Sequence, residues 1–85
     1  MKVKHHENQI VNEIHAWIQL LKKGKFEGGI LTANLCHAYN WATNPNALRT
    51  YQEHNHCRRL ARYCHKQLKK RDFWHETENG KMIMD

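Results

Sequence analysis

A dense run of basic side chains lies near the C-terminal end of this 85-residue sequence. Between Cys57 and Arg71 there are seven Lys or Arg residues and no Asp or Glu. The whole chain has 14 Lys and Arg against 8 Asp and Glu, a formal net charge of +6. Clustered cations favour polyphosphate partners, because each neutralised phosphate releases condensed counterions. The run therefore predicts a polyanionic partner, with a purely solubilising surface as the alternative.

Eight histidines and three cysteines could supply the ligands of a zinc site. The combinations to consider are Cys36 with His37, His54 and His56 with Cys57, and Cys64 with His65. No Cys-x-x-Cys pair is present, and Cys57 and Cys64 are spaced as on the apolar stripe of a helix. We therefore expect buried core cysteines rather than metal ligands, and no cofactor. An odd number of cysteines also favours a reducing compartment.

No catalytic motif is present, so an enzyme is not expected. The sequence has no nucleophile elbow, no phosphate-cradling glycine loop and no pair of carboxylates predicted to share a cleft. Gly28 and Gly29 are expected to form a turn. The three tryptophans are expected to pack in the core, with stacking on unpaired bases as the alternative; they are Trp17, Trp41 and Trp74.

The N-terminal part of the chain predicts a flexible basic arm over residues 1–6, followed by a single domain over residues 7–85. Apolar residues spaced by three and four predict an amphipathic helix over residues 7–23, ended by Gly24. Its apolar stripe consists of Ile10, Ile14, Trp17 and Leu21. No signal peptide and no run of membrane-spanning length is seen, so we expect a cytoplasmic protein that does not enter the membrane.

The middle of the chain is expected to contain a short strand and a second helix. Ile30-Leu31-Thr32 is short and β-like, and Thr32 can cap a helix over residues 33–42. Residues 43–46 are rich in loop formers. Residues 46–54 are compatible with either a short helix or a structured loop.

The C-terminal part predicts a two-sided helix over residues 55–70 and a hairpin over residues 73–84. At 100° per residue, the apolar and the basic residues of the helix fall on opposite faces. The apolar stripe contains Cys57, Leu60, Ala61, Cys64 and Leu68, and the basic side contains Arg58, Arg59, Arg62, His65, Lys66, Lys69 and Lys70. A two-residue Asn79-Gly80 turn would pair Glu78 with Lys81 and Thr77 with Met82.

This order of elements resembles the winged helix-turn-helix family of DNA-binding proteins. The resemblance rests on Leu31-Thr32 leading into the second helix, on the basic helix, and on the hairpin around Asn79-Gly80. It implies an α+β fold: a small winged helix-turn-helix of three or four helices with a C-terminal β-hairpin wing. The sequence departs from the family in its long connection over residues 42–54 and in the acidic Glu76 and Glu78 of the wing.

The resemblance implies that the basic helix enters the major groove. Residues near its start are then expected to contact base edges, and these are Asn55, His56, Arg58 and Arg59. Residues further along the same face are expected to contact phosphates, and these are Arg62, Lys66, Lys69 and Lys70. Lys81, beside the turn of the wing, is expected to contact the DNA backbone.

The expected function is sequence- or structure-selective binding of double-stranded DNA, by a small transcriptional regulator or DNA-transaction accessory factor. The small size suggests a phage or another mobile element as its source. A homodimer formed through the first helix would multiply affinity on paired half-sites. The alternatives are a protein that docks its basic helix on an acidic protein partner and inhibits it, and a binder of RNA or single-stranded nucleic acid. Histidine gains a positive charge as the pH falls through the neutral range. We therefore expect nucleic acid to bind more tightly as the pH falls from about 8 to about 6, through His54, His56 and His65.

Overall fold

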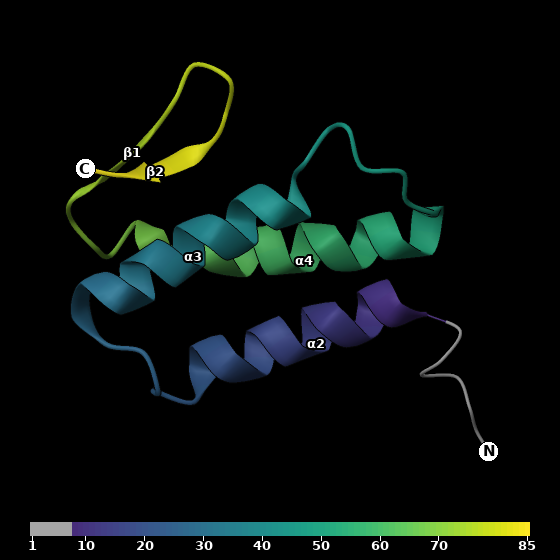
Figure 1. Ribbon diagram of the computed structural model, residues 1–85, viewed down its shortest axis with the longest axis horizontal. Helices are drawn as coiled ribbons and strands as arrows, with labels where there is room; N and C mark the ends of the chain where they lie inside the picture. Colours follow the sequence, from purple (N-terminus) through teal and green to yellow (C-terminus); the bar gives the residue numbers. More distant parts are fainter. Residues whose placement is uncertain (1–7) are drawn as a thin grey trace.

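The computed structural model describes residues 8–85, which form three helices followed by a two-stranded hairpin (Figure 1). The elements are α2 (Gln9–Lys22), α3 (Gly28–Ala42), α4 (Tyr51–Leu68), β1 (Trp74–Glu76) and β2 (Met82–Met84). The predicted α+β class, with helices first and a hairpin last, is confirmed. The basic arm predicted over residues 1–6 lies outside the described residues. None of the helices within residues 8–85 combines the length and apolar character needed to cross a membrane.

Helix α2 forms where the spacing of apolar residues predicts it. Asn8 caps the first turn, because its side-chain oxygen accepts a hydrogen bond from the Val11 amide at 3.1 Å. Ile14 and Leu21, two residues of the predicted stripe, are buried. Gly24 follows the helix with a φ of 75°, the left-handed conformation that ends helices and suits glycine.

Helix α3 begins at Gly28, so the strand predicted over residues 30–32 is wrong. The first turn is helical, because the first two amides of that segment donate to the Glu27 carbonyl at 3.2 and 3.3 Å. Thr32, predicted as a cap, lies inside the helix, where its hydroxyl donates to the Gly28 carbonyl at 3.3 Å. The β-propensity of a short apolar run is weak, and packing of one helical face against the rest of the core outweighs it.

Helix α4 begins at Tyr51, one turn before the predicted start at residue 55, and ends at Leu68. A capping box fixes this start: the Thr50 hydroxyl accepts from the Glu53 amide at 3.2 Å, and the Glu53 carboxylate accepts from the Thr50 amide at 2.9 Å. The sequence is compatible with either a loop or a helix over residues 46–54. In the structure, residues 46–50 belong to a loop and residues 51–54 form the start of α4. A loop over residues 43–50 therefore connects α3 to α4.

The C-terminal hairpin is present, but its register differs by one residue from the prediction. Glu76 lies opposite Met82. The predicted two-residue turn would instead have placed Thr77 opposite Met82. The loop has three residues, 78–80, and its terminal glycine has a φ of 85°, a common alternative to the two-residue turn. A shift of one residue exchanges the two faces of a strand, and in the observed register the Met82 side chain is buried in the core.

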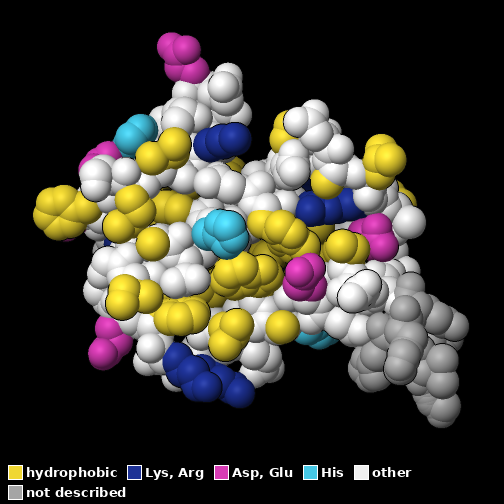
Figure 2. Space-filling view, viewed as in Figure 1, with side chains coloured by type: hydrophobic (Ala, Val, Ile, Leu, Met, Phe, Trp, Pro, Cys, Tyr) yellow, Lys and Arg dark blue, Asp and Glu magenta, His cyan; other side chains and the backbone are white. Residues whose placement is uncertain are grey.

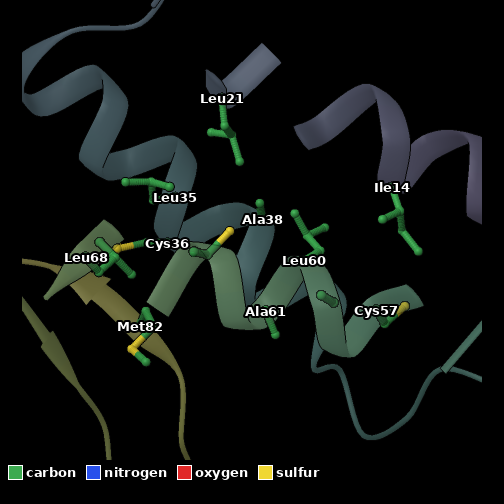
Figure 3. Close-up of a cluster of buried hydrophobic side chains, with 12 residues drawn as sticks. Ile14, Leu21, Leu35, Cys36, Ala38, Cys57, Leu60, Ala61, Leu68 and Met82 are labelled. Carbon is green, nitrogen blue, oxygen red and sulfur yellow. The ribbon is translucent and has the colours of Figure 1, made fainter. Parts of the chain in front are cut away.

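The core lies where the three helices and β2 meet (Figure 3). Its buried apolar residues are Ile14, Leu21, Leu35, Cys36, Ala38, Ala42, Cys57, Leu60, Ala61, Cys64, Leu68 and Met82. All three cysteines are free thiols buried in this core, as expected for small apolar side chains. The tryptophans are half-buried and pack against the same cluster, so the predicted core role is confirmed for Trp17, Trp41 and Trp74.

Candidate nucleic-acid interface

Six cationic side chains form one face of α4 and of the turn that follows it. We call this the basic face; it consists of Arg58, Arg59, Arg62, Lys66, Lys69 and Lys70, all of them exposed. The buried residues of α4 are the five predicted for its apolar stripe, on the opposite side of the helix. The two-sided helix predicted from the sequence is therefore confirmed. At 1.5 Å per residue, the basic face extends over about 18 Å.

The basic face is not neutralised by the chain's own carboxylates within residues 8–85. None of its six side chains forms an ion pair or a side-chain hydrogen bond in that part of the chain, where the one ion pair joins His75 Nδ1 to Asp85 Oδ1 at 2.5 Å. The acidic residue nearest to the start of the face, Glu53, is engaged in capping α4. The face thus leaves its cations free for an external anion.

Arg71, the last basic residue of the run, does not belong to this face. Its Nε donates to the Thr32 hydroxyl at 2.7 Å, and its Nη2 donates to the Gly28 carbonyl at 2.9 Å. The Arg71 carbonyl in turn accepts from Trp74 Nε1 at 2.9 Å. Arg71 therefore fastens the segment after α4 to the first turn of α3.

Arg49 has a similar structural role in the loop before α4. Its Nη1 donates to the Ala42 carbonyl at 2.8 Å and lies 3.1 Å from the Cys57 sulfur, while Nη2 donates to the Trp41 carbonyl at 2.9 Å. The guanidinium also lies over the Trp41 ring, 4.7 Å from its centroid. The local sequence gives no signal of this role, because Arg49 stands in a loop without apolar periodicity.

Asn55 and His56 do not begin the helix, so their predicted place at its start is wrong. The capping box adds a turn in front of them, and both residues are half-buried in the second turn of α4. The His56 ring packs beside His15 of α2, with 5.8 Å between the ring centroids. Both histidines and Arg59 line a hollow of about 240 Å³ between α2 and α4. His56 thus faces α2 rather than the middle of the basic face.

A second hollow borders the basic face on the side of α3. It measures about 230 Å³ and is lined by Tyr39, Arg58, Ala61, Arg62 and His65. The Tyr39 and His65 rings lie side by side, with centroids 6.2 Å apart. Burial raises the pKa of Tyr39, and the nearby Glu76 and Cys64 raise it further, so the phenol stays protonated as a hydrogen-bond donor. Arginine, histidine and tyrosine donors together suit a phosphate.

The hairpin is held on α3 by one amide side chain. Asn40 Nδ2 donates to the Met82 carbonyl and Asn40 Oδ1 accepts from the Met82 amide, both at 2.8 Å. Lys81 is exposed beside the turn. In Figure 1 the turn of the hairpin projects away from the helices.

Basic and apolar side chains gather on different faces of the molecule. In the view of Figure 2, apolar side chains form a broad band between α2 and α3, and Lys and Arg side chains are few and scattered. Helix α3 passes in front of α4 in the same view (Figure 1), and the apolar stripe of α4 packs beneath it. The basic face is therefore directed away from the apolar band.

Comparisons of this chain with protein-family models, with curated proteins and with solved structures found no match. Within residues 8–85, no group of three or more His, Cys, Asp and Glu side chains is arranged to hold a metal ion. What the described structure offers to a ligand is the basic face and the hollows that border it.

Proposed function

We propose that this chain binds nucleic acid, with double-stranded DNA as the principal ligand, through the basic face of α4. The observation that carries this proposal is the presence of six exposed cations on one side of a single helix, with no internal carboxylate paired to them within residues 8–85. The opposite side of α4 is fixed in the core. The cations are therefore presented on a rigid support, which favours a regular array of phosphates as the partner.

The major groove of DNA admits an α-helix, and α4 is the helix that we place there. In this arrangement Asn55, in the second turn of α4, and Arg58 and Arg59, near the middle of the helix, contact base edges. Arg62 and the lysines of the basic face contact phosphates and set the register. Three helices followed by a hairpin agree with the layout of a winged helix, and the hairpin then approaches the DNA backbone with Lys81. The role that follows is that of a small regulator or accessory factor in DNA transactions.

A titration of random-sequence duplex DNA, followed by fluorescence anisotropy at several salt concentrations, tests this proposal. If the basic face neutralises six phosphates, the logarithm of the association constant should fall against the logarithm of salt concentration with a slope of about −5. The variant Arg58→Glu/Arg59→Glu/Arg62→Glu should abolish binding. Its helical circular-dichroism spectrum should remain that of the wild type, because all three side chains are exposed.

The matched control is Lys22→Glu/Lys23→Glu/Lys25→Glu, which changes the net charge by the same amount at exposed positions outside the basic face. Of these three side chains, Lys22 contacts α4, where it lies over the Tyr63 ring at 5.4 Å from the centroid. This variant should retain most of the duplex affinity. Equal losses in both triple variants would show a diffuse charge effect and would contradict a defined interface. Absence of duplex binding by the wild type at low salt would instead favour an acidic protein as the partner of the basic face.

A further inference from the structure

Phe73 adopts a backbone conformation that phenylalanine rarely takes. Its φ is 67°, and it is the one non-glycine residue within residues 8–85 with a positive φ. A left-handed backbone is unfavourable for a bulky residue, and such conformations persist only where the surrounding structure enforces them. Burial of the ring does not compensate here, since 77% of the residue's surface is exposed. Packing in the core therefore does not explain a phenylalanine at this position.

The segment on both sides of Phe73 is fixed by hydrogen bonds. The Phe73 carbonyl accepts from the Asp85 amide at 2.9 Å, and Trp74 Nε1 donates to the Arg71 carbonyl at 2.9 Å. Arg71 is itself fastened to Thr32 and Gly28 of α3. The backbone that carries the exposed ring is thus fixed by hydrogen bonds on both sides.

The ring borders a hollow of about 400 Å³, within the size range of small-molecule pockets. Its lining residues are Gly28, Gly29, Thr32, Lys70, Arg71, Asp72, Phe73 and Met84. In Figure 1 the start of α3, the segment after α4 and the C-terminal strand meet at one end of the molecule, where these residues lie. The two glycines leave part of the wall without side chains, so the hollow is open to a flat ligand.

The hollow is continuous with the basic face. Lys70 lines the hollow and also ends the basic face, where it directly follows Lys69. A phosphate chain that follows the basic face therefore reaches the hollow at this end. Inside it, the Asp72 carboxylate disfavours another phosphate, while it can accept hydrogen bonds from the amino groups of a nucleobase.

From this arrangement we propose that Phe73 stacks on an unpaired nucleobase, so that the preferred ligand is a DNA duplex that continues into a single strand. This inference rests on the proposed function, because the phosphates of the ligand lie on the basic face. An exposed aromatic ring beside a cationic surface is the combination that binds single strands, whereas the bases of an intact duplex already stack on one another.

The test compares a blunt duplex with the same duplex bearing a short single-stranded overhang, by anisotropy at fixed salt. The wild type should bind the overhang substrate about tenfold more tightly, the gain expected from stacking of one base. Phe73→Gly should lose this preference and keep its affinity for the blunt duplex. Phe73→Tyr should retain the preference, because its ring can stack in the same way. A 2-aminopurine in the overhang should be quenched by the wild type and not by Phe73→Gly.

Two controls separate stacking from damage to the fold. Phe73→Gly should be at least as resistant to thermal unfolding as the wild type, because glycine accepts the positive φ. Ile30→Ala removes an exposed apolar side chain that does not line the hollow, and should leave the preference unchanged.

The outcomes distinguish the inference from the proposed function. Equal binding of blunt and overhang substrates by the wild type overturns the inference and leaves duplex binding intact. A preference that survives in Phe73→Gly also overturns the inference. Failure to bind any nucleic acid overturns the proposed function, and the inference with it.

Discussion

At the end of α3, the Arg49 guanidinium donates to two carbonyl groups and lies against the Cys57 sulfur and the Trp41 ring. The arginines of the basic face form no such bonds within residues 8–85. The guanidinium presents several donors in a rigid plane, so it can close a loop onto a helix end as readily as it can bind a phosphate. Residue type alone therefore does not show which role an arginine has. The role depends on whether backbone carbonyl groups lie within reach of the guanidinium.

Replacement of Arg49 should destabilise the protein. Arg49→Ala removes one hydrogen bond from each of two carbonyl groups at the end of α3, and the Trp41 carbonyl keeps only long bonds from backbone amides, such as that of Asn44 at 3.5 Å. It also removes the contact with the Trp41 ring. We expect a loss of about 2 kcal/mol in the free energy of unfolding, measured by urea denaturation. Arg49→Lys should recover only part of the lost stability, because its ammonium group keeps the positive charge but lacks the planar fork of donors.

The control for this measurement is Arg58→Ala, at an exposed arginine of the basic face. It should change the free energy of unfolding by no more than about 0.5 kcal/mol. Similar changes in the free energy of unfolding for Arg49→Ala and Arg58→Ala would show that the hydrogen bonds of Arg49 contribute nothing to stability.

Among the elements, the hairpin depends on α3 for its position. Two strands of three residues each are too short to be stable alone. The Asn40 side chain forms hydrogen bonds with both the amide and the carbonyl of Met82, as a neighbouring strand would. The Met82 side chain is buried in the core. The asparagine on α3 thus replaces a third strand, which is why the hairpin forms without the strand predicted over residues 30–32.

Asn40→Asp should release the hairpin from α3. The carboxylate can still accept from the Met82 amide but cannot donate to the Met82 carbonyl, which is then left without this partner. We expect faster hydrogen exchange at amides of the hairpin, with the exchange of α4 little changed. Thr43→Ala is the control, since the Thr43 hydroxyl bonds only to the Tyr39 carbonyl of its own helix among the residues described. Unchanged hairpin exchange in Asn40→Asp would contradict the role given to Asn40.

The whole molecule shares one small core in which three thiols from α3 and α4 are buried. Burial raises the pKa of the Cys36 and Cys57 thiols, although the Arg49 guanidinium partly offsets the effect at Cys57. Burial, and secondarily the proximity of Cys36, raises the pKa of Cys64 from 9.0 to about 12. Neutral thiols thus belong to the folded state, and ionisation of a thiol opposes folding.

Stability should therefore fall in alkaline solution. The pKa of Cys64 is higher in the folded state than in the unfolded chain, so the folded state retains its proton where the unfolded chain loses it. Its contribution to the free energy of unfolding is complete below about pH 9 and is lost as the pH rises toward about 12. The free energy of unfolding, measured by urea denaturation at several pH values in this range, should decline as the pH rises. It should decline less steeply with pH for Cys64→Ala. A slope unaffected by this substitution would assign the decline to other groups.

At the scale of the whole chain, much of the fold follows from the sequence pattern. Apolar spacing predicts α2 and the buried stripe of α4, and Gly24 and Gly80 mark a helix end and a hairpin turn. The start of α4 is also encoded locally, in the Thr50–Glu53 capping box, which directly follows a segment rich in loop formers. For the candidate site, the sequence predicts the six residues of the basic face, whereas the Phe73 hollow brings together residues from α3, the segment after α4 and β2.

The sequence by itself determined which face of α4 is apolar and which is cationic, because helical periodicity acts over a few residues and requires no partner. Tertiary structure alone decided that residues 30–32 join a helix, that Arg49 and Arg71 are bound internally, and that the Phe73 ring stays in solvent. These features depend on carbonyl groups and packing surfaces supplied from elsewhere in the chain. Contacts of that kind leave no periodic trace in the sequence, since they form only when distant segments meet.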